Sequence, residues 1–170
     1  YQRWNPAAGV SGLLEADHKQ YLVDAYRKYS PLIPADRRGT SYAIPLSSAT
    51  VSRLTAAGQC SYEDYDATRH TRYRSILGTL SHVANFTHPE MAFAISFASQ
   101  YMQNPSEAHL DILLNILLYV YAARDKVVWF RRQAHSPDVS PIMVACDADL
   151  SNSANCQSRT GFCAYLFGML

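Results

Sequence analysis

Hydrophobic residues recur at helical spacing through the middle of the chain and predict three consecutive helices, at about 69–85, 89–103 and 105–123. At about 100° per residue, one side of the first helix is apolar. That side carries Tyr73, Ile76, Leu77, Leu80, Val83 and Ala84. The second helix opens with Pro89, which suits a first helical position. Its expected buried residues are Met91, Ala94, Ile95, Ala98 and Met102.

The third helix is expected to begin with a capping box in which Asn104 is the N-cap, Pro105 follows and Glu107 stands at the third position. The run from Leu110 to Tyr121 is then apolar on nearly every side. It is too short to span a membrane, and Asp111 and Asn115 interrupt it. We therefore expect a helix buried between other helices.

The first 66 residues follow a different pattern. A hairpin or an irregular turn is expected between Tyr1 and Leu14, and a helix between Asp17 and Tyr29, which ends at Ser30-Pro31. Residues 30–66 are rich in Pro, Gly, Ser and Thr and predict a long loop.

Beyond Arg124 the period changes to that of strands. Strands are expected at 127–130, at Ile142–Cys146, where the strand should be buried, and at Gly161–Phe167. The predicted class is α+β, with segments at 1–66, 67–137 and 138–170. Further chain is expected on both sides of this segment, because two strands cannot bury a sheet alone.

Composition narrows the possible functions only slightly. A hydrophobic share of 48% with 17% charged residues predicts a packed core. The net charge of +1 favours neither a nucleic acid nor a membrane as partner for the whole chain. The four cysteines lack C-x-x-C spacing, so buried free thiols in a cytosolic protein are expected in preference to a zinc site.

Two features could carry chemistry, since the common catalytic signatures are absent. Asp147 and Asp149 follow the expected buried strand and could hold a hard divalent cation through oxygen, although an acidic turn is the commoner meaning of such a pair. Arg74, Gly78 and His82 share one sector of the first helix. Glycine within a helix costs about 1 kcal/mol relative to alanine. Approach of a nucleic acid would explain it, and packing against a neighbouring helix would explain it equally well.

The order of the motifs resembles the copia-type retrotransposon polyprotein. The matching segments are Tyr73 to Leu80, Thr87 to Ala94, Asn104 to His109, Asp147 to Asp149, and Ser158 to Gly161. The resemblance implies that residues 1–66 contain the end of the polymerase palm, and that the three helices are the thumb and connection region of a reverse transcriptase. A ribonuclease H-like domain would then begin near residue 140.

Several roles follow from that resemblance. Arg74, Gly78 and His82 would lie along the minor groove of an RNA–DNA hybrid or DNA duplex. Asp147 would be a catalytic carboxylate holding Mg²⁺, and Asp149 would be a second metal ligand. Both active sites would be incomplete in this segment, which would act with the remainder of the polyprotein, away from membranes, in a cytoplasmic particle or the nucleus.

The segment departs from the family at several positions. Asn115 to Val120 lacks two positive charges of the family pattern, and Leu150, Leu110 and His88 replace other usual residues. Such losses suggest a decayed genomic copy. Two other functions remain open. One is a non-catalytic helical module for protein–protein interaction with an exposed tyrosine-rich surface; the other is a metal-dependent transferase, disfavoured because no nucleotide-binding glycine loop accompanies the aspartates.

Overall fold

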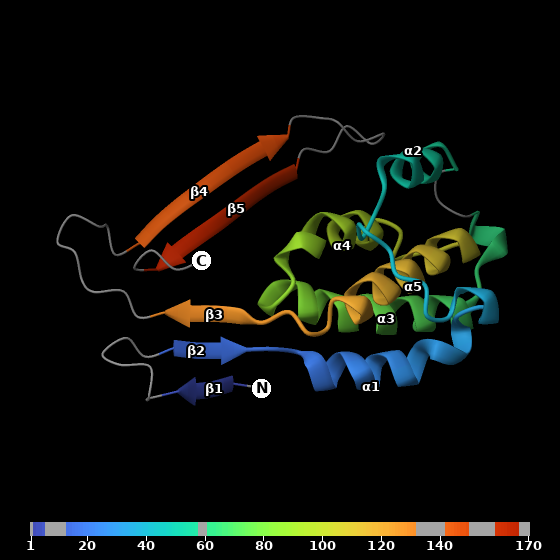
Figure 1. Cartoon of the computed structure of the whole chain (residues 1–170). Helices are drawn as coiled ribbons and strands as arrows, with labels where there is room; N and C mark the ends of the chain where they lie inside the picture. Colours follow the sequence, from blue (N-terminus) through green and yellow to red (C-terminus); the bar gives the residue numbers. More distant parts are fainter. Residues whose placement is uncertain (1, 6–12, 58–60, 132–141, 150–158, 167–170) are drawn as a thin grey trace. The chain divides into compact units, whose positions relative to one another are not determined.

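The computed structural model describes residues 2–5, 13–57, 61–131, 142–149 and 159–166. These residues form two compact units. The first is helical and comprises 17–127, and the second contains the strands in 2–16 and 128–170. Helices with a few antiparallel strands confirm the α+β class (Figure 1). The predicted boundary near residue 138 lies outside the described residues.

The described residues of the helical unit form five α-helices, with short 3₁₀ turns between them. The helices are α1 (Lys19–Tyr29), α2 (Ser48–Ala57), α3 (Ala67–Phe86), α4 (Ala92–Ser99) and α5 (Glu107–Ala122). The 3₁₀ turns are η1 (Ser30–Leu32), η2 (Ala35–Arg37), η3 (Tyr62–Asp64) and η4 (Pro89–Met91). All three helices predicted in the middle of the chain are therefore present, and the second one starts as a 3₁₀ turn with Pro89 at its head.

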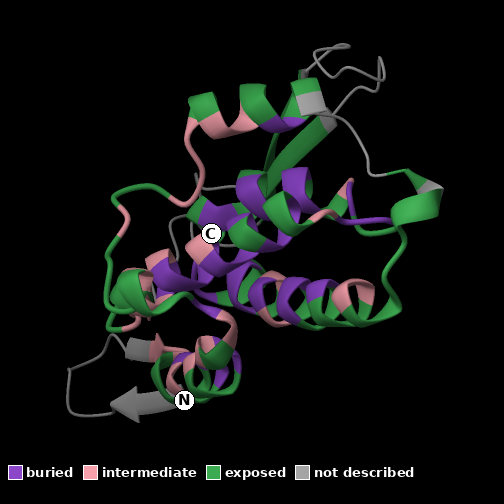
Figure 2. Ribbon diagram, turned by 90° about the vertical axis from the view of Figure 1, so that its right-hand side faces the viewer, coloured by how far each residue is buried: buried purple, intermediate pink, exposed green. Residues whose placement is uncertain are grey.

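The core lies where α3 packs against α4 and α5, and where α1 packs against α5. Buried residues gather on the facing sides of these helices (Figure 2). All six apolar positions predicted on α3 are buried. On α5, nine residues from His109 to Val120 are buried, as expected for a helix surrounded by others. Tyr26 of α1 stacks on Tyr121 of α5, with ring centroids 4.0 Å apart.

Two details of the second predicted helix are wrong. Met102 is 37% exposed, because α4 ends at Ser99 and a turn redirects the chain before Met102. Phe97 is buried instead, where its ring meets Tyr101 edge to face.

Among the described residues, no helix has the length and apolar character needed to cross a membrane.

The N-cap of α5 is Ser106 and not Asn104. The Ser106 side chain accepts a hydrogen bond from the His109 amide, while His109 Nδ1 accepts from the Ser106 amide at 3.0 Å. Tertiary contacts occupy the groups expected to form the cap. The Asn104 side chain donates to the Ser61 carbonyl at 2.8 Å, and Arg69 Nε donates to the Pro105 carbonyl at 2.6 Å.

The long loop predicted at 30–66 is wrong, because α2 lies within it. Ser47 Oγ accepts from the Thr50 amide at 3.2 Å, which satisfies one of the free donors at the start of this helix. Leu54 is 1% exposed and attaches α2 to the core. A single buried anchor among small polar residues produces no clear periodicity, so the sequence pattern did not indicate a helix here.

In the strand unit, the described residues form two separate sheets. β1 (Gln2–Asn5) and β2 (Leu13–Ala16) form the expected hairpin, and β3 (Val128–Arg131) adds antiparallel to β2. β4 (Ile142–Asp149) pairs antiparallel with β5 (Arg159–Leu166). The expectation of a buried strand at 142–146 is wrong: Ile142 is 62% exposed and Val144 is 54% exposed. A two-stranded ribbon leaves both faces open unless another element covers it.

Candidate nucleic-acid interface

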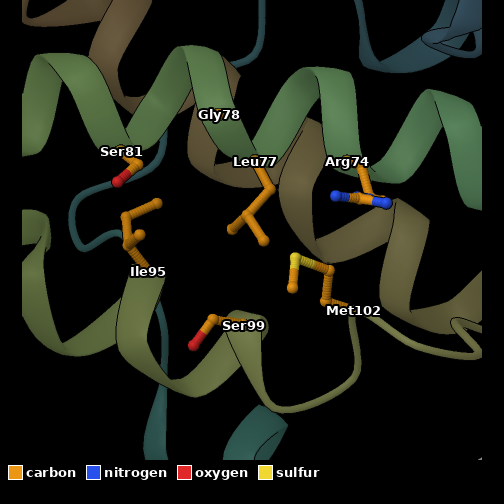
Figure 3. Close-up of a pocket in the computed structure, with 7 residues that line it drawn as sticks. All are labelled: Arg74, Leu77, Gly78, Ser81, Ile95, Ser99 and Met102. Atoms are coloured by element: carbon orange, nitrogen blue, oxygen red, sulfur yellow. The ribbon is translucent and has the colours of Figure 1, made fainter.

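A surface groove of about 380 Å³ runs between α3 and the segment formed by α4 and the turn after it. Its lining residues are Arg74, Leu77, Gly78, Ser81, Ile95, Ser99 and Met102 (Figure 3). Leu77 and Ile95 are buried and form an apolar floor. Arg74 and Met102 lie toward one end of the groove, and Ser81 lies toward the other. The groove therefore combines one cation, two hydroxyls and an apolar base.

Gly78 is exposed on α3, at the side of this groove. Apart from its chain neighbours and the nearby backbone of α3 itself, a Cβ atom placed on Gly78 would meet no atom of the described residues within 4 Å. Packing against a neighbouring helix within this unit therefore does not explain why the position is glycine. Glycine costs about 1 kcal/mol of helix stability relative to alanine, and packing inside the unit does not account for that cost.

Arg74 stands one turn before Gly78 and is exposed. Its guanidinium has no hydrogen-bond or ion-pair partner in the part of the chain that the structure describes. Arg69, on the same helix, is different. It donates to the carbonyl oxygens of Pro105 and Asp64, both at 2.6 Å, and so holds the start of α5. Arg69 is structural, whereas Arg74 is available to a ligand.

Tyr73 fixes the distance between the two walls of the groove. Its ring is fully buried, and its hydroxyl donates to the Ala98 carbonyl at 2.7 Å, which joins α3 to α4 from within the core. Burial raises the pKa of Tyr73, so the hydroxyl keeps its proton. Arg74 follows Tyr73 directly and is carried outward by the helical rotation.

His82 is the third residue predicted for this surface, and it does not line the groove. It lies in an aromatic cluster with His18, Tyr21 and Phe86. Its Nε2 is 3.3 Å from His18 Nε2, and Nδ1 of His18 is 2.8 Å from Thr87 Oγ1. Burial, and then the neighbouring His82, lower the pKa of His18. The structure thus brings Arg74 and Gly78 together and places His82 toward α1.

Sequence reasoning missed a charged network around Glu90, because no local pattern signals it. Its Oε1 lies 2.8 Å from Lys126 Nζ and 3.0 Å from Nδ1 of the fully buried His88. Burial alone would raise the pKa of Glu90, but hydrogen bonds from Lys126 and His88 outweigh it and lower the pKa to about 2. The network attaches the turn before α4 to the segment after α5.

Asp147 and Asp149 lie on β4, opposite Gly161 and Arg159 of β5. Asp147 is exposed. Within the described ranges, no group of three or more His, Cys, Asp or Glu side chains could hold a metal ion. The prediction of buried thiols is wrong for Cys146 and Cys163, which are exposed on this ribbon; Cys60 and Cys156 lie outside the described residues.

Comparison with known proteins decides the relationship. The chain is 34% identical over 119 residues, 70% of its length, to the retrovirus-related Pol polyprotein from transposon RE2 of Arabidopsis thaliana. It is also 34% identical over 71 residues, 42% of its length, to the corresponding polyprotein from transposon RE1. A putative transposon protein of Saccharomyces cerevisiae is 31% identical over 46% of the chain. The homologues of this chain are transposon Pol polyproteins.

The relationship to retrotransposon polyproteins that the order of motifs predicted is thus confirmed. This Pol homologue spans only 7% of the RE2 polyprotein, 5% of the RE1 polyprotein and 24% of the yeast protein. No family model matches the chain. No solved structure matches it.

Proposed function

We propose that this chain corresponds to the thumb and connection region of a retrotransposon reverse transcriptase, followed by the start of its ribonuclease H domain. The Pol homologues and the order of the five motifs support this assignment. The three helices α3, α4 and α5 would be the thumb and connection region. β4 and β5 would be the first strands of the ribonuclease H domain. The remainder of the polyprotein would be its partner, in a cytoplasmic particle or the nucleus.

The groove beside Gly78 would contact the sugar–phosphate backbone of an RNA–DNA hybrid or DNA duplex. One observation carries this proposal: Gly78 is an exposed helical glycine with open space beside it, one turn from an arginine without a partner among the described residues. A backbone can approach a helix closely only where no side chain projects. We therefore attribute glycine at this position to contact with an external molecule and not to packing within the fold.

The lining residues suit a sequence-independent contact. Arg74 supplies a permanent positive charge for a phosphate, and the Ser81 hydroxyl can donate to phosphate or sugar oxygens. The Ser99 hydroxyl already donates to the Ser96 carbonyl at 2.7 Å, so its oxygen can only accept, as from a ribose hydroxyl. Leu77, Ile95 and Met102 offer apolar surface for the faces of the sugars. Apart from Arg74, none of these groups has the paired donors and acceptors that distinguish one base from another.

Asp147 would contribute one carboxylate to a Mg²⁺ site of the nuclease, with Asp149 nearby in sequence. Carboxylate oxygen suits Mg²⁺, but the described residues do not supply enough ligands for two-metal hydrolysis. When bound, the metal ions would activate water and stabilise the leaving oxygen. This chain's contribution would be limited to holding a cation at Asp147, and it would not cleave a hybrid alone.

Fluorescence anisotropy with a labelled RNA–DNA hybrid tests the groove. Arg74→Ala should weaken binding equally for hybrids of different sequence and reduce the slope of log affinity against log salt by about one unit, because one phosphate contact is lost. Arg72→Ala is the matched control, since Arg72 is exposed on α3 but does not line the groove. It should change affinity much less.

Gly78→Ala and Gly78→Leu test the close approach. Alanine should leave the fold intact or stabilise it by up to about 1 kcal/mol, because no atom opposes a Cβ there. Both variants should weaken hybrid binding, leucine more than alanine. Binding that is insensitive to salt and unchanged in Arg74→Ala and Gly78→Ala would contradict the proposal and favour the protein–protein interaction module.

A further inference from the structure

Two histidines that are 64 residues apart in the sequence meet where the start of α1 approaches α3. His18 directly precedes α1, and His82 lies near the end of α3. Their Nε2 atoms are 3.3 Å apart, and the ring centroids are 5.0 Å apart with the planes inclined by 79°. His82 is exposed and His18 is half-buried, so solvent can reach both rings.

This arrangement matches two imidazoles bound to one tetrahedral ion. With Zn–N bonds of about 2.0–2.1 Å and a tetrahedral angle, the two nitrogens would be about 3.3–3.4 Å apart. Allowing about 1.2 Å from nitrogen to ring centre, the centroids would be about 5.2 Å apart. A straight N–H···N hydrogen bond of the same length would place them about 5.7 Å apart. The observed 5.0 Å is closer to the first geometry.

A neighbouring residue also orients one of the rings. Thr87 Oγ1 lies 2.8 Å from His18 Nδ1, and Thr87 is only 5% exposed, which restricts rotation of the imidazole. A histidine that donates through Nδ1 presents the lone pair of Nε2, and metal-binding histidines usually have such a second partner. Tyr21 and Phe86 pack beside His82 and limit the movement of the second ring.

We propose that His18 and His82 form a two-histidine site for a divalent transition-metal ion of the zinc class. Imidazole nitrogen favours Zn²⁺, Ni²⁺ and Cu²⁺, whereas Mg²⁺ prefers oxygen. The described residues offer no third protein ligand. Water, or a donor from a bound partner, would therefore complete the coordination. The ion would connect the start of α1 to α3, and so stabilise the folded helical unit.

The experiment titrates the full chain, with its thiols alkylated, with ZnCl₂ and separately with MgCl₂. Calorimetry should show one zinc-binding site per chain. Magnesium should not shift the ¹⁵N signals of the two rings. In ¹⁵N spectra of the histidine side chains, Nε2 of both His18 and His82 should shift together as zinc is added. Thermal unfolding should move to higher temperature with zinc and should not move with magnesium.

His18→Ala and His82→Ala should each weaken zinc binding by about tenfold or more, and the double variant should bind no more weakly than either one, because a chelate is lost at the first substitution. His70→Ala is the control, since His70 is on α3 but contacts Tyr65 instead. Thr87→Val should weaken binding less than loss of a ligand. Unchanged zinc affinity in either His18→Ala or His82→Ala, or zinc shifts confined to one ring, would show only a hydrogen-bonded pair and overturn the proposal.

Discussion

The hydroxyl of Tyr73 donates a hydrogen bond to the Ala98 carbonyl at 2.7 Å within the core and so connects α3 to the last turn of α4. The residue after Tyr73 is Arg74, and the one after Ala98 is Ser99, both of which line the proposed nucleic-acid groove. The same buried contact therefore supports the fold and sets the width of the groove.

Tyr73→Phe should destabilise the chain by about 0.5–1.5 kcal/mol, because it removes a buried hydrogen bond while keeping the ring. The Ala98 carbonyl still accepts from the Tyr101 amide at 3.1 Å, so it is not left unsatisfied. Urea unfolding measures the change. Tyr65→Phe is the matched control, since Tyr65 is 49% exposed, and it should have little effect. Equal stability of the Tyr73→Phe variant and the parent would show that the bond contributes no net free energy.

The buried His109 predicts a loss of stability in mild acid. Burial lowers the pKa of His109 to about 4, whereas an unfolded histidine titrates near 6.5. The unfolded state therefore takes up the proton first as the pH falls. The stabilisation is complete above about pH 6.5 and is lost progressively toward pH 4, by about 3 kcal/mol if this residue acts alone.

His109→Gln isolates that effect. Glutamine at the third helical position can keep the reciprocal cap with Ser106 without a titrating ring. The free energy of unfolding of this variant, measured in urea between pH 7 and pH 5, should depend less steeply on pH. An unchanged slope would assign the acid sensitivity to other groups, of which His18 is the first to test, since its pKa is also lowered.

Amide hydrogen exchange should be faster in residues 142–146 of β4 than in the interior of α5. The side chains of residues 142–146 are exposed, and β4 pairs only with β5 among the described strands. By contrast, α5 is buried along most of its length. Local opening of a two-stranded ribbon requires little loss of buried apolar area. Equal protection in the two elements would mean that something covers the ribbon in solution.

The chain should not cleave an RNA–DNA hybrid in the presence of Mg²⁺. Two-metal hydrolysis needs several carboxylates around the ions, and the described residues contain no group of three potential ligands. Gel analysis of a labelled hybrid checks this, with Asp147→Asn as the comparison. Magnesium-dependent cleavage that disappears in Asp147→Asn would refute the prediction.

The helical faces of α3 and α5 were predictable because the hydrophobic period is a local property of the chain. All six apolar positions on α3 are buried, and α5 is surrounded as its composition predicted. The order of motifs also indicated the relationship to transposon Pol polyproteins, since residue identity and spacing need no coordinates. In the same way, the sector of Arg74 and Gly78 followed from helical rotation alone.

Tertiary contacts decided the features that the sequence pattern missed or misplaced. The N-cap of α5 is Ser106, because distant residues occupy the groups predicted to form the cap. Asn104 binds Ser61 and Pro105 binds Arg69, and both partners are more than 30 residues away in the sequence. Met102 is exposed because the chain turns after Ser99. His82 contacts His18, which precedes α1, and so does not line the predicted surface with Arg74 and Gly78. Each outcome depends on which distant segments meet, and local periodicity carries no information about that.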